Sequence, residues 1–291
     1  MLKTNKRYPV LYKKIHLIWK EFIQRIKILY AKINVIHYLT EREERHNMKK
    51  FITISLASLL VICGLGFTGF YIWSQQTYKA AEEVTSYVNM DDVQMEENWL
   101  VFQPQEKTQN GIILYPGAKV EPEAYSYYAQ GLANNGYMVI IPKVNLNFAL
   151  LDINQADLIM EEFSTIENWY VGGHSLGGVA AASYAHEHLD DIDGLLLLAS
   201  YPSNSNDFSA TDMPILSLYA EFDGLTTTDK IADTKHLLSS EATLYEVKGG
   251  NHAQFGMYGT QEGDGKATIS AKKQQDESIK ETVNWINAYK K

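Results

Sequence analysis

A serine enclosed by glycines is the feature that most constrains this 291-residue chain. Residues 173–177 read Gly-His-Ser-Leu-Gly, with the serine at position 175. Aromatic and β-branched residues precede this run and small residues follow it, so a strand is expected to pass into a closely packed helix. Glycines on both sides let two backbones approach without a clash of Cβ atoms, and a serine in such a turn projects its hydroxyl near the helix N-terminus. The pattern predicts a nucleophile at Ser175; a glycine-rich turn without chemistry is the competing interpretation.

Two later segments each place a side chain suited to catalysis directly after an expected strand. One apolar run leads to Asp223 at a turn, and a second leads to His252 in a loop. Open parallel sheets carry their sites at the carboxyl ends of the strands, so these side chains are expected to meet Ser175. Imidazole accepts and returns a proton near neutral pH, and a carboxylate fixes its tautomer. We therefore predict a Ser175, Asp223 and His252 triad, with Glu221 as the rival acid.

Strand and helix patterns alternate between residues 97 and 291. Continuous apolar runs predict buried strands, and apolar residues at helical spacing predict the helices between them. This alternation predicts a mainly parallel sheet covered by helices on both faces. The expected strands are 99–102, 111–115, 137–141, the run before Ser175, 194–199, and runs beginning at 216 and 243; the expected helices include 125–133, 154–163 and 275–289.

These motifs resemble the α/β-hydrolase superfamily, in particular compact serine hydrolases of the esterase and dienelactone-hydrolase type. The resemblance implies an α/β-hydrolase fold for residues 97–291 and acyl transfer that needs no cofactor. The oxyanion of that reaction requires two donors. One is expected from the N–H of Leu176 and, by the resemblance, the other from Ala118, with Gly117 forming a tight turn. The connection 200–212 is short, so no cap domain is expected. The resemblance rests on residues 115–118, 173–178, 221–226 and 250–256.

Two interpretations without catalysis compete with this hydrolase. One is a ligand- or partner-binding protein on a hydrolase fold, and the other is a membrane-tethered interaction protein with an incidental pocket. If the chain is an enzyme, its expected partner is a small-molecule acyl substrate that contains an ester, thioester or amide. No metal site is expected, because His186 and His188 lack a clear third ligand. The acidic charge of the domain gives no nucleic-acid footprint, and the sequence leaves the oligomeric state open.

An apolar run near the N-terminus predicts one membrane-spanning helix. Residues 51–73 are 23 uncharged positions, and a spanning helix needs about 20. Residues 1–50 hold 13 Lys and Arg against 4 Asp and Glu, a net charge of +9, whereas residues 51–291 hold 13 against 31, a net charge of −18. Because basic flanks stay cytoplasmic, we expect a signal-anchor in the cell membrane with the acidic domain extracytoplasmic. A cleavable signal peptide is the alternative. The polar residues 74–96 are expected to form a stalk.

The first 47 residues admit two interpretations. They are basic with scattered apolar residues, as in a helix that lies on a membrane surface. However, Met48-Lys49-Lys50 directly before the apolar run is typical of the start of an exported bacterial protein, and residues 41–45 can be encoded entirely by purines, like a ribosome-binding site. Our hypothesis is that translation starts at Met48. Intact-mass measurement of the native protein tests it, and a product that begins at Met1 would end the idea.

Overall fold

The computed structural model describes residues 8–37 and 44–289 and forms two compact units, which divide between Phe67 and Thr68. The first unit contains two long helices, α1 (Tyr8–His37) and most of α2 (Glu44–Ser74). Within this unit the ring of Trp19 on α1 lies 3.8 Å from the position that a Cβ on Gly64 would occupy. The two helices therefore contact each other at that point.

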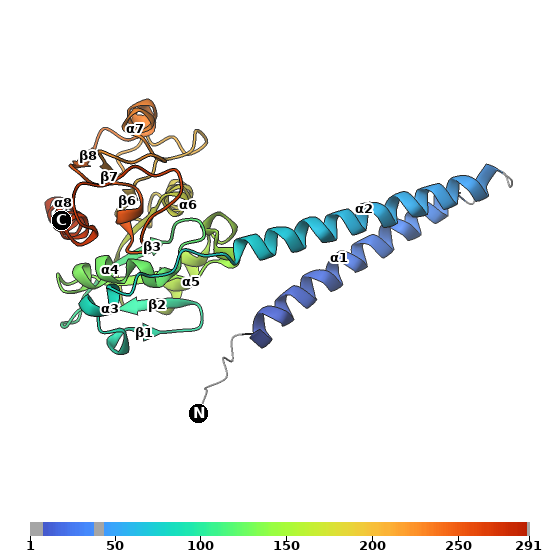
Figure 1. Ribbon diagram of the computed structural model, residues 1–291, viewed down its shortest axis with the longest axis horizontal. Coiled ribbons are helices and arrows are strands. Elements are labelled where there is room, and N and C mark those ends of the chain that lie inside the picture. The colour runs from blue at the N-terminus through green and yellow to red at the C-terminus, as the bar shows by residue number, and fades with distance from the viewer. Residues whose placement is uncertain (1–7, 38–43, 290–291) are drawn as a thin grey trace. The chain divides into compact units, whose positions relative to one another are not determined.

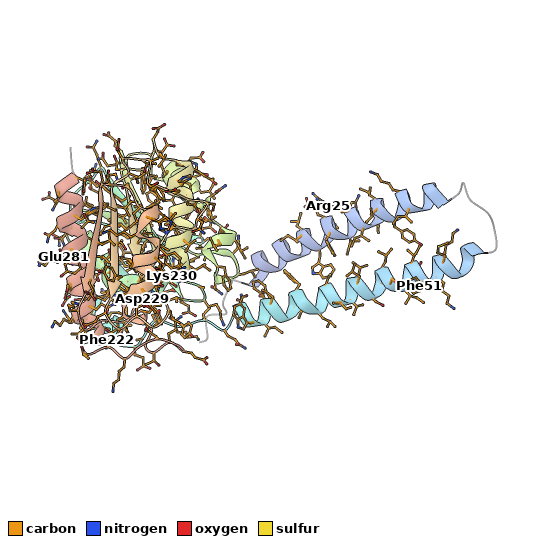
Figure 2. The ribbon with its side chains drawn as sticks, turned by 90° about the horizontal axis from the view of Figure 1, so that it is seen from above. Arg25, Phe51, Phe222, Asp229, Lys230 and Glu281 are labelled. Atoms are coloured by element: carbon orange, nitrogen blue, oxygen red, sulfur yellow. The ribbon has the colours of Figure 1, made fainter. Side chains whose placement is uncertain are left out.

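Most of the large apolar side chains on helix α2 are exposed. Among the described residues, the stretch Met48–Ser74 is the one that is long and apolar enough to cross a membrane, with a mean hydropathy of 2.2 and no buried residue in its most apolar 18-residue window. Phe51 is 72% exposed and Ile62 is 65% exposed, and Figure 2 shows the Phe51 side chain projecting from the helix. Contiguous apolar surface of this kind marks a protein or membrane contact.

The second unit is built on one eight-stranded sheet within the described residues (Figure 1). The strand order is β1-β2-β4-β3-β5-β6-β7-β8. Strand β2 is antiparallel to both of its neighbours, and every other pair is parallel, which confirms the expected mainly parallel sheet. The strands are β1 (Gln94–Met95), β2 (Trp99–Phe102), β3 (Asn110–Tyr115), β4 (Met138–Pro142), β5 (Asn168–His174), β6 (Gly194–Leu198), β7 (Ile215–Ala220) and β8 (Ala242–Val247).

Helices cover both faces of this sheet because successive strand residues point to opposite sides. Ile112 belongs to a core shared with α4 and α8, whereas its neighbour Ile113 belongs to a core shared with α5 and α6. The connection 199–214 holds neither helix nor strand, so it does not form a cap domain. The helices of this unit are α3 (Val84–Tyr87), α4 (Ser126–Ala133), α5 (Gln155–Glu162), α6 (Leu176–Glu187), α7 (Thr228–Thr234) and α8 (Ala271–Tyr289), with single 3₁₀ turns η1 (Met90–Asp92), η2 (Pro122–Tyr125), η3 (Asn145–Asn147), η4 (Ala149–Leu151), η5 (Lys235–Leu237) and η6 (Ala253–Phe255).

Residues 74–96 pack on the sheet domain, and the expectation of a stalk is wrong. Val84 and Val88 are each only 2% exposed, and Val88 belongs to the core that includes α4 and α8. Tyr78 also forms a parallel bridge with Val120. The polar composition of the segment conceals these widely spaced apolar contacts, which bury enough surface to attach it to the domain.

This packing predicts a stability effect that a stalk would not show. Val84→Ala should lower the free energy of unfolding by about 2 kcal/mol, because it removes two buried methyl groups and leaves a cavity. Glu83→Ala, at the exposed neighbouring position, should change it by less than about 0.5 kcal/mol. Urea unfolding followed by tryptophan fluorescence measures both. Wild-type stability in the Val84 variant would contradict the packing.

Candidate active site

Ser175 occupies the turn between β5 and α6 in a backbone conformation that L-residues rarely adopt. Its φ is 53° and its ψ is −123°. Such a conformation costs on the order of 1–3 kcal/mol and persists only where the surroundings hold it. The Ser175 N–H donates to the carbonyl of Leu198 at 2.9 Å, and the Ser200 hydroxyl donates to the carbonyl of Ser175 at 2.7 Å. Both bonds hold the strained residue in place.

The glycines on either side of Ser175 are required by close backbone contacts. A Cβ on Gly173 would lie 2.4 Å from the carbonyl carbon of Gly177. A Cβ on Gly177 would lie 2.3 Å from the carbonyl oxygen of Tyr115. Backbone atoms cannot move aside as a flexible side chain can, so larger residues are excluded at both positions. The spacing of these glycines therefore allows α6 to begin directly against the ends of β3 and β5.

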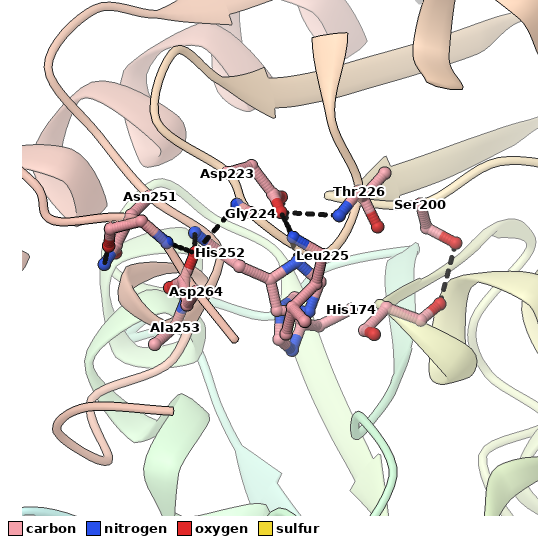
Figure 3. Close-up of polar contacts among 12 residues, drawn as sticks. His174, Ser200, Asp223, Gly224, Leu225, Thr226, Asn251, His252, Ala253 and Asp264 are labelled. Carbon is pink, nitrogen blue, oxygen red and sulfur yellow. Dashed lines mark hydrogen bonds and ion pairs between the residues drawn. The ribbon is translucent and has the colours of Figure 1, made fainter. Parts of the chain in front are cut away.

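Asp223 and His252 form a buried pair beyond the ends of β7 and β8 (Figure 3). The two atoms Nδ1 of His252 and Oδ2 of Asp223 are 2.8 Å apart. The other carboxylate oxygen of Asp223, Oδ1, accepts hydrogen bonds from the N–H groups of Leu225 at 2.8 Å and Thr226 at 2.6 Å. An ionised carboxylate only accepts, so His252 donates from Nδ1 and its Nε2 is the basic nitrogen. That Nε2 is buried and has no hydrogen-bond partner in the described part of the chain.

The loop that carries His252 lies against the strand that leads to Ser175. The ring centroid of His252 is 4.6 Å from that of His174, the residue before the serine. No hydrogen bond joins Ser175 Oγ to His252 Nε2 in the described residues. Catalytic hydrogen bonds in ligand-free sites often form only when substrate binds. Glu221, the rival acid, is exposed and accepts the N–H of Gly249 at 2.9 Å.

The expected oxyanion-hole residues differ in whether their N–H groups already donate a hydrogen bond within the protein. The N–H of Gly117 donates to the hydroxyl of Tyr125 at 2.9 Å, so Gly117 supplies the turn but no free donor. Among the hydrogen bonds of residues 8–37 and 44–289, none starts from the N–H of Ala118 or of Leu176. Leu176 is the first residue of α6, where helix N–H groups lack intrahelical acceptors.

A second carboxylate, Asp264, joins the acid turn to the histidine loop. Its Oδ1 accepts hydrogen bonds from the N–H groups of Gly224 at 3.1 Å and His252 at 3.2 Å. Its Oδ2 accepts a hydrogen bond from the N–H of Ala253 at 2.8 Å (Figure 3). Sequence reasoning missed this residue, because it lies in a polar, glycine-rich stretch without periodicity. Its position twelve residues after His252 was the only available signal.

Comparison with known proteins places this architecture in a family. The sequence profile of the Alpha/beta hydrolase family matches residues 111–276, which is more than half of the chain. The chain belongs to the α/β hydrolase family. The match includes the segments that carry Ser175, Asp223 and His252. No functionally curated protein matches the chain.

Solved structures of other proteins share the fold. A predicted CIB-like hydrolase from Thermoplasma acidophilum aligns with a TM-score of 0.51 at 15% identity, over 67% of this chain and 97% of its own. MGS-MChE2, an α/β hydrolase enzyme from a sediment metagenome of the Mar Chica lagoon in Morocco, gives 0.51 at 16% identity, over 67% and 98%. Est1E from Butyrivibrio proteoclasticus gives 0.50 at 12% identity, over 67% and 98%. At these identities the likeness shows the fold alone, which confirms the expected α/β-hydrolase fold.

In this α/β hydrolase, His174 connects the 117–121 loop to the histidine loop. It is 1% exposed, and its Nδ1 lies 2.9 Å from the hydroxyl oxygen of Tyr125, which also accepts the N–H of Gly117. The hydroxyl proton of Tyr125 has no other acceptor in the described residues, so it is assigned to Nδ1 of a neutral His174. Burial lowers the pKa of His174 well below its ordinary value of 6.5, and positive charge on His252 lowers it further.

The lowered pKa of His174 predicts how stability changes with pH. The unfolded chain binds a proton at this histidine below about pH 6.5, whereas the folded chain does not, so the free energy of unfolding should fall as the pH drops. The slope from this residue is at most about 1.4 kcal/mol per pH unit. His174→Gln should flatten the slope between about pH 6.5 and 5, while His236→Gln, at an exposed position, should keep it. Urea unfolding across this pH range measures the slopes. Equal slopes in wild type and His174→Gln would disprove the contribution of His174 to the pH dependence.

Proposed function

We propose that this α/β hydrolase is a membrane-anchored serine hydrolase that cleaves an ester, thioester or amide through Ser175, Asp223 and His252. The observation that carries the proposal is the strained turn at Ser175 beside a buried Asp223–His252 pair. A packing role alone needs neither a positive φ at a serine nor a buried histidine that bonds to a carboxylate through one ring nitrogen and leaves the other unbonded. Both features suit a nucleophile that transfers its proton to a base.

In the proposed reaction, Ser175 Oγ bonds to the acyl carbon while its proton passes to His252 Nε2. The former carbonyl oxygen accepts the N–H groups of Leu176 and Ala118 as it becomes negative. The bond between the acyl carbon and the leaving oxygen, sulfur or nitrogen then breaks, and His252 gives its proton to that atom. Water repeats these steps on the acyl-enzyme and releases the acid and free Ser175. Asp223 stays ionised and stabilises the imidazolium form of His252.

The anchoring part of the proposal rests on α2 and on charge. Met48–Ser74 has the length and hydropathy of a spanning helix, and most of its large apolar side chains are exposed. The net charge of +9 before residue 51 and −18 after it orients such a helix with its N-terminus in the cytoplasm. The hydrolase domain is therefore proposed to lie outside the cell membrane, tethered by a single uncleaved helix.

A serine-directed probe tests the nucleophile. A fluorophosphonate should label the wild-type chain, and Ser175→Ala should abolish labelling and lower the turnover of a p-nitrophenyl ester by at least about a thousandfold, because both depend on the same oxygen. Ser183→Ala is the matched control, since Ser183 lies on the same helix α6 and its hydroxyl donates to Asn206 Oδ1 at 3.0 Å. In-gel fluorescence and mass mapping locate the label. Full turnover in Ser175→Ala refutes the assignment.

A further inference from the structure

The end of α2 and a loop beside the active site share one apolar surface within the second unit. We define this apolar rim as Phe70, Trp73, Phe148, Leu150 and Leu151. The ring centroid of Phe148 lies 5.8 Å from that of Phe70 and 5.6 Å from that of Trp73, with both pairs stacked. Leu150 is 40% exposed and Leu151 is 55% exposed. Exposed leucines and aromatic rings in one group are unusual on a surface that faces only water.

The rim belongs to the same edge of the sheet as the proposed chemistry. Phe148, Leu150 and Leu151 follow β4, whose carboxyl end lies beside that of β3 because the two strands are parallel neighbours. The 117–121 loop, which carries the proposed oxyanion donor Ala118, follows β3. The rim loop and the oxyanion loop therefore leave the sheet side by side, at the edge where sites of open parallel sheets lie.

Hydrogen bonds join α2 and its following segment to this oxyanion loop. Lys119 donates its N–H to the carbonyl of Asn147 at 2.8 Å, and Asn147 donates from Nδ2 to the carbonyl of Ser74 at 2.9 Å. The N–H of Tyr78 donates to the carbonyl of Lys119 at 2.7 Å, and the Lys119 ammonium lies 4.2 Å from the ring centroid of Trp73. The last turn of the apolar helix is thus tied directly to the loop that is proposed to bind the oxyanion.

The backbone of these loops is strained, which shows that their placement is specific. Lys119, Leu146 and Asn147 have φ values of 60°, 55° and 60°. Left-handed conformations are unfavourable for L-residues and persist only where other contacts outweigh the cost. Here those contacts are the hydrogen bonds to Ser74 and between the two loops.

We infer that the apolar rim lies in the outer interface of the bilayer, and that the active site accepts a lipid ester whose acyl chain remains in that leaflet. The inference rests on the proposed function and names its substrate class. The rim is continuous with the proposed spanning helix, and aromatic side chains concentrate at membrane interfaces. A site at this level receives the carbonyl of a lipid without full extraction of its chain, which avoids the cost of transferring the apolar chain to water.

Membrane contact is tested by a readout that does not depend on catalysis. Cys63 is the only cysteine, so Cys63→Ser allows one fluorophore to be placed at Leu150→Cys in the full chain. In phosphatidylcholine vesicles, lipids with a nitroxide near the headgroup should quench this fluorophore. The matched control is Leu189→Cys, because Leu189 has the same 40% exposure but follows α6 at the amino edge of the sheet. Equal quenching at both positions would overturn the membrane contact.

The substrate class is tested by comparing two esters in the same vesicles. Wild type should hydrolyse a long-chain monoacylglycerol in the vesicle and soluble p-nitrophenyl butyrate. The double variant Leu150→Ser/Leu151→Ser should lower the ratio of the monoacylglycerol rate to the p-nitrophenyl butyrate rate by about tenfold, because less apolar surface enters the leaflet. The control Leu189→Ser should leave this ratio unchanged. Wild-type hydrolysis of the soluble ester alone, or an unchanged ratio in the double variant, would overturn the substrate class. If the wild-type protein hydrolyses neither ester, the result counts against the proposed hydrolase itself. The quenching experiment still decides the membrane contact in that case.

Discussion

The close backbone approach around Ser175 is the constraint on which the rest of the site depends. Helix α6 starts against the ends of β3 and β5, which is possible only because Gly173 and Gly177 carry no Cβ. This approach forces Ser175 into a positive φ, and bonds from its backbone to Leu198 and Ser200 prevent its relaxation. The hydroxyl is thereby presented on rigid elements, as a precise catalytic geometry requires. The packed sheet offsets the local strain.

Asp223 and His252, the proposed acid and base, come from two separate loops that hydrogen bonds hold together. A buried carboxylate is strongly destabilising unless donors surround it. Asp223 meets this condition with two backbone N–H groups and the imidazole of His252. Asp264 adds a second link, since one carboxylate accepts N–H groups from both loops. These hydrogen bonds fix the geometry of the pair without a ligand, which is the preorganisation that the proposed catalysis requires.

The connection between the apolar helix and the chemistry is equally specific. The chain that leaves α2 pairs at Tyr78 with Val120, so the segment after the helix packs on the sheet domain. The same stretch of chain bonds to Lys119, next to the proposed oxyanion donor Ala118. If the proposed membrane contact exists, chain connectivity and these local hydrogen bonds bring the lipid surface close to the loop that carries Ala118.

Local patterns in the sequence determined the alternation of strands and helices, the turn at Ser175, the acid and base that follow later strands, and the apolar length of 51–73. Each depends on periodicity, on turn residues or on composition, which are properties of neighbouring residues. Tertiary structure alone decided that Val84 is buried, that His174 bonds to Tyr125, and that Asp264 ties two loops together. These contacts form between segments that are distant or irregular in sequence, and no local pattern encodes which polar groups meet when the loops close over a sheet edge.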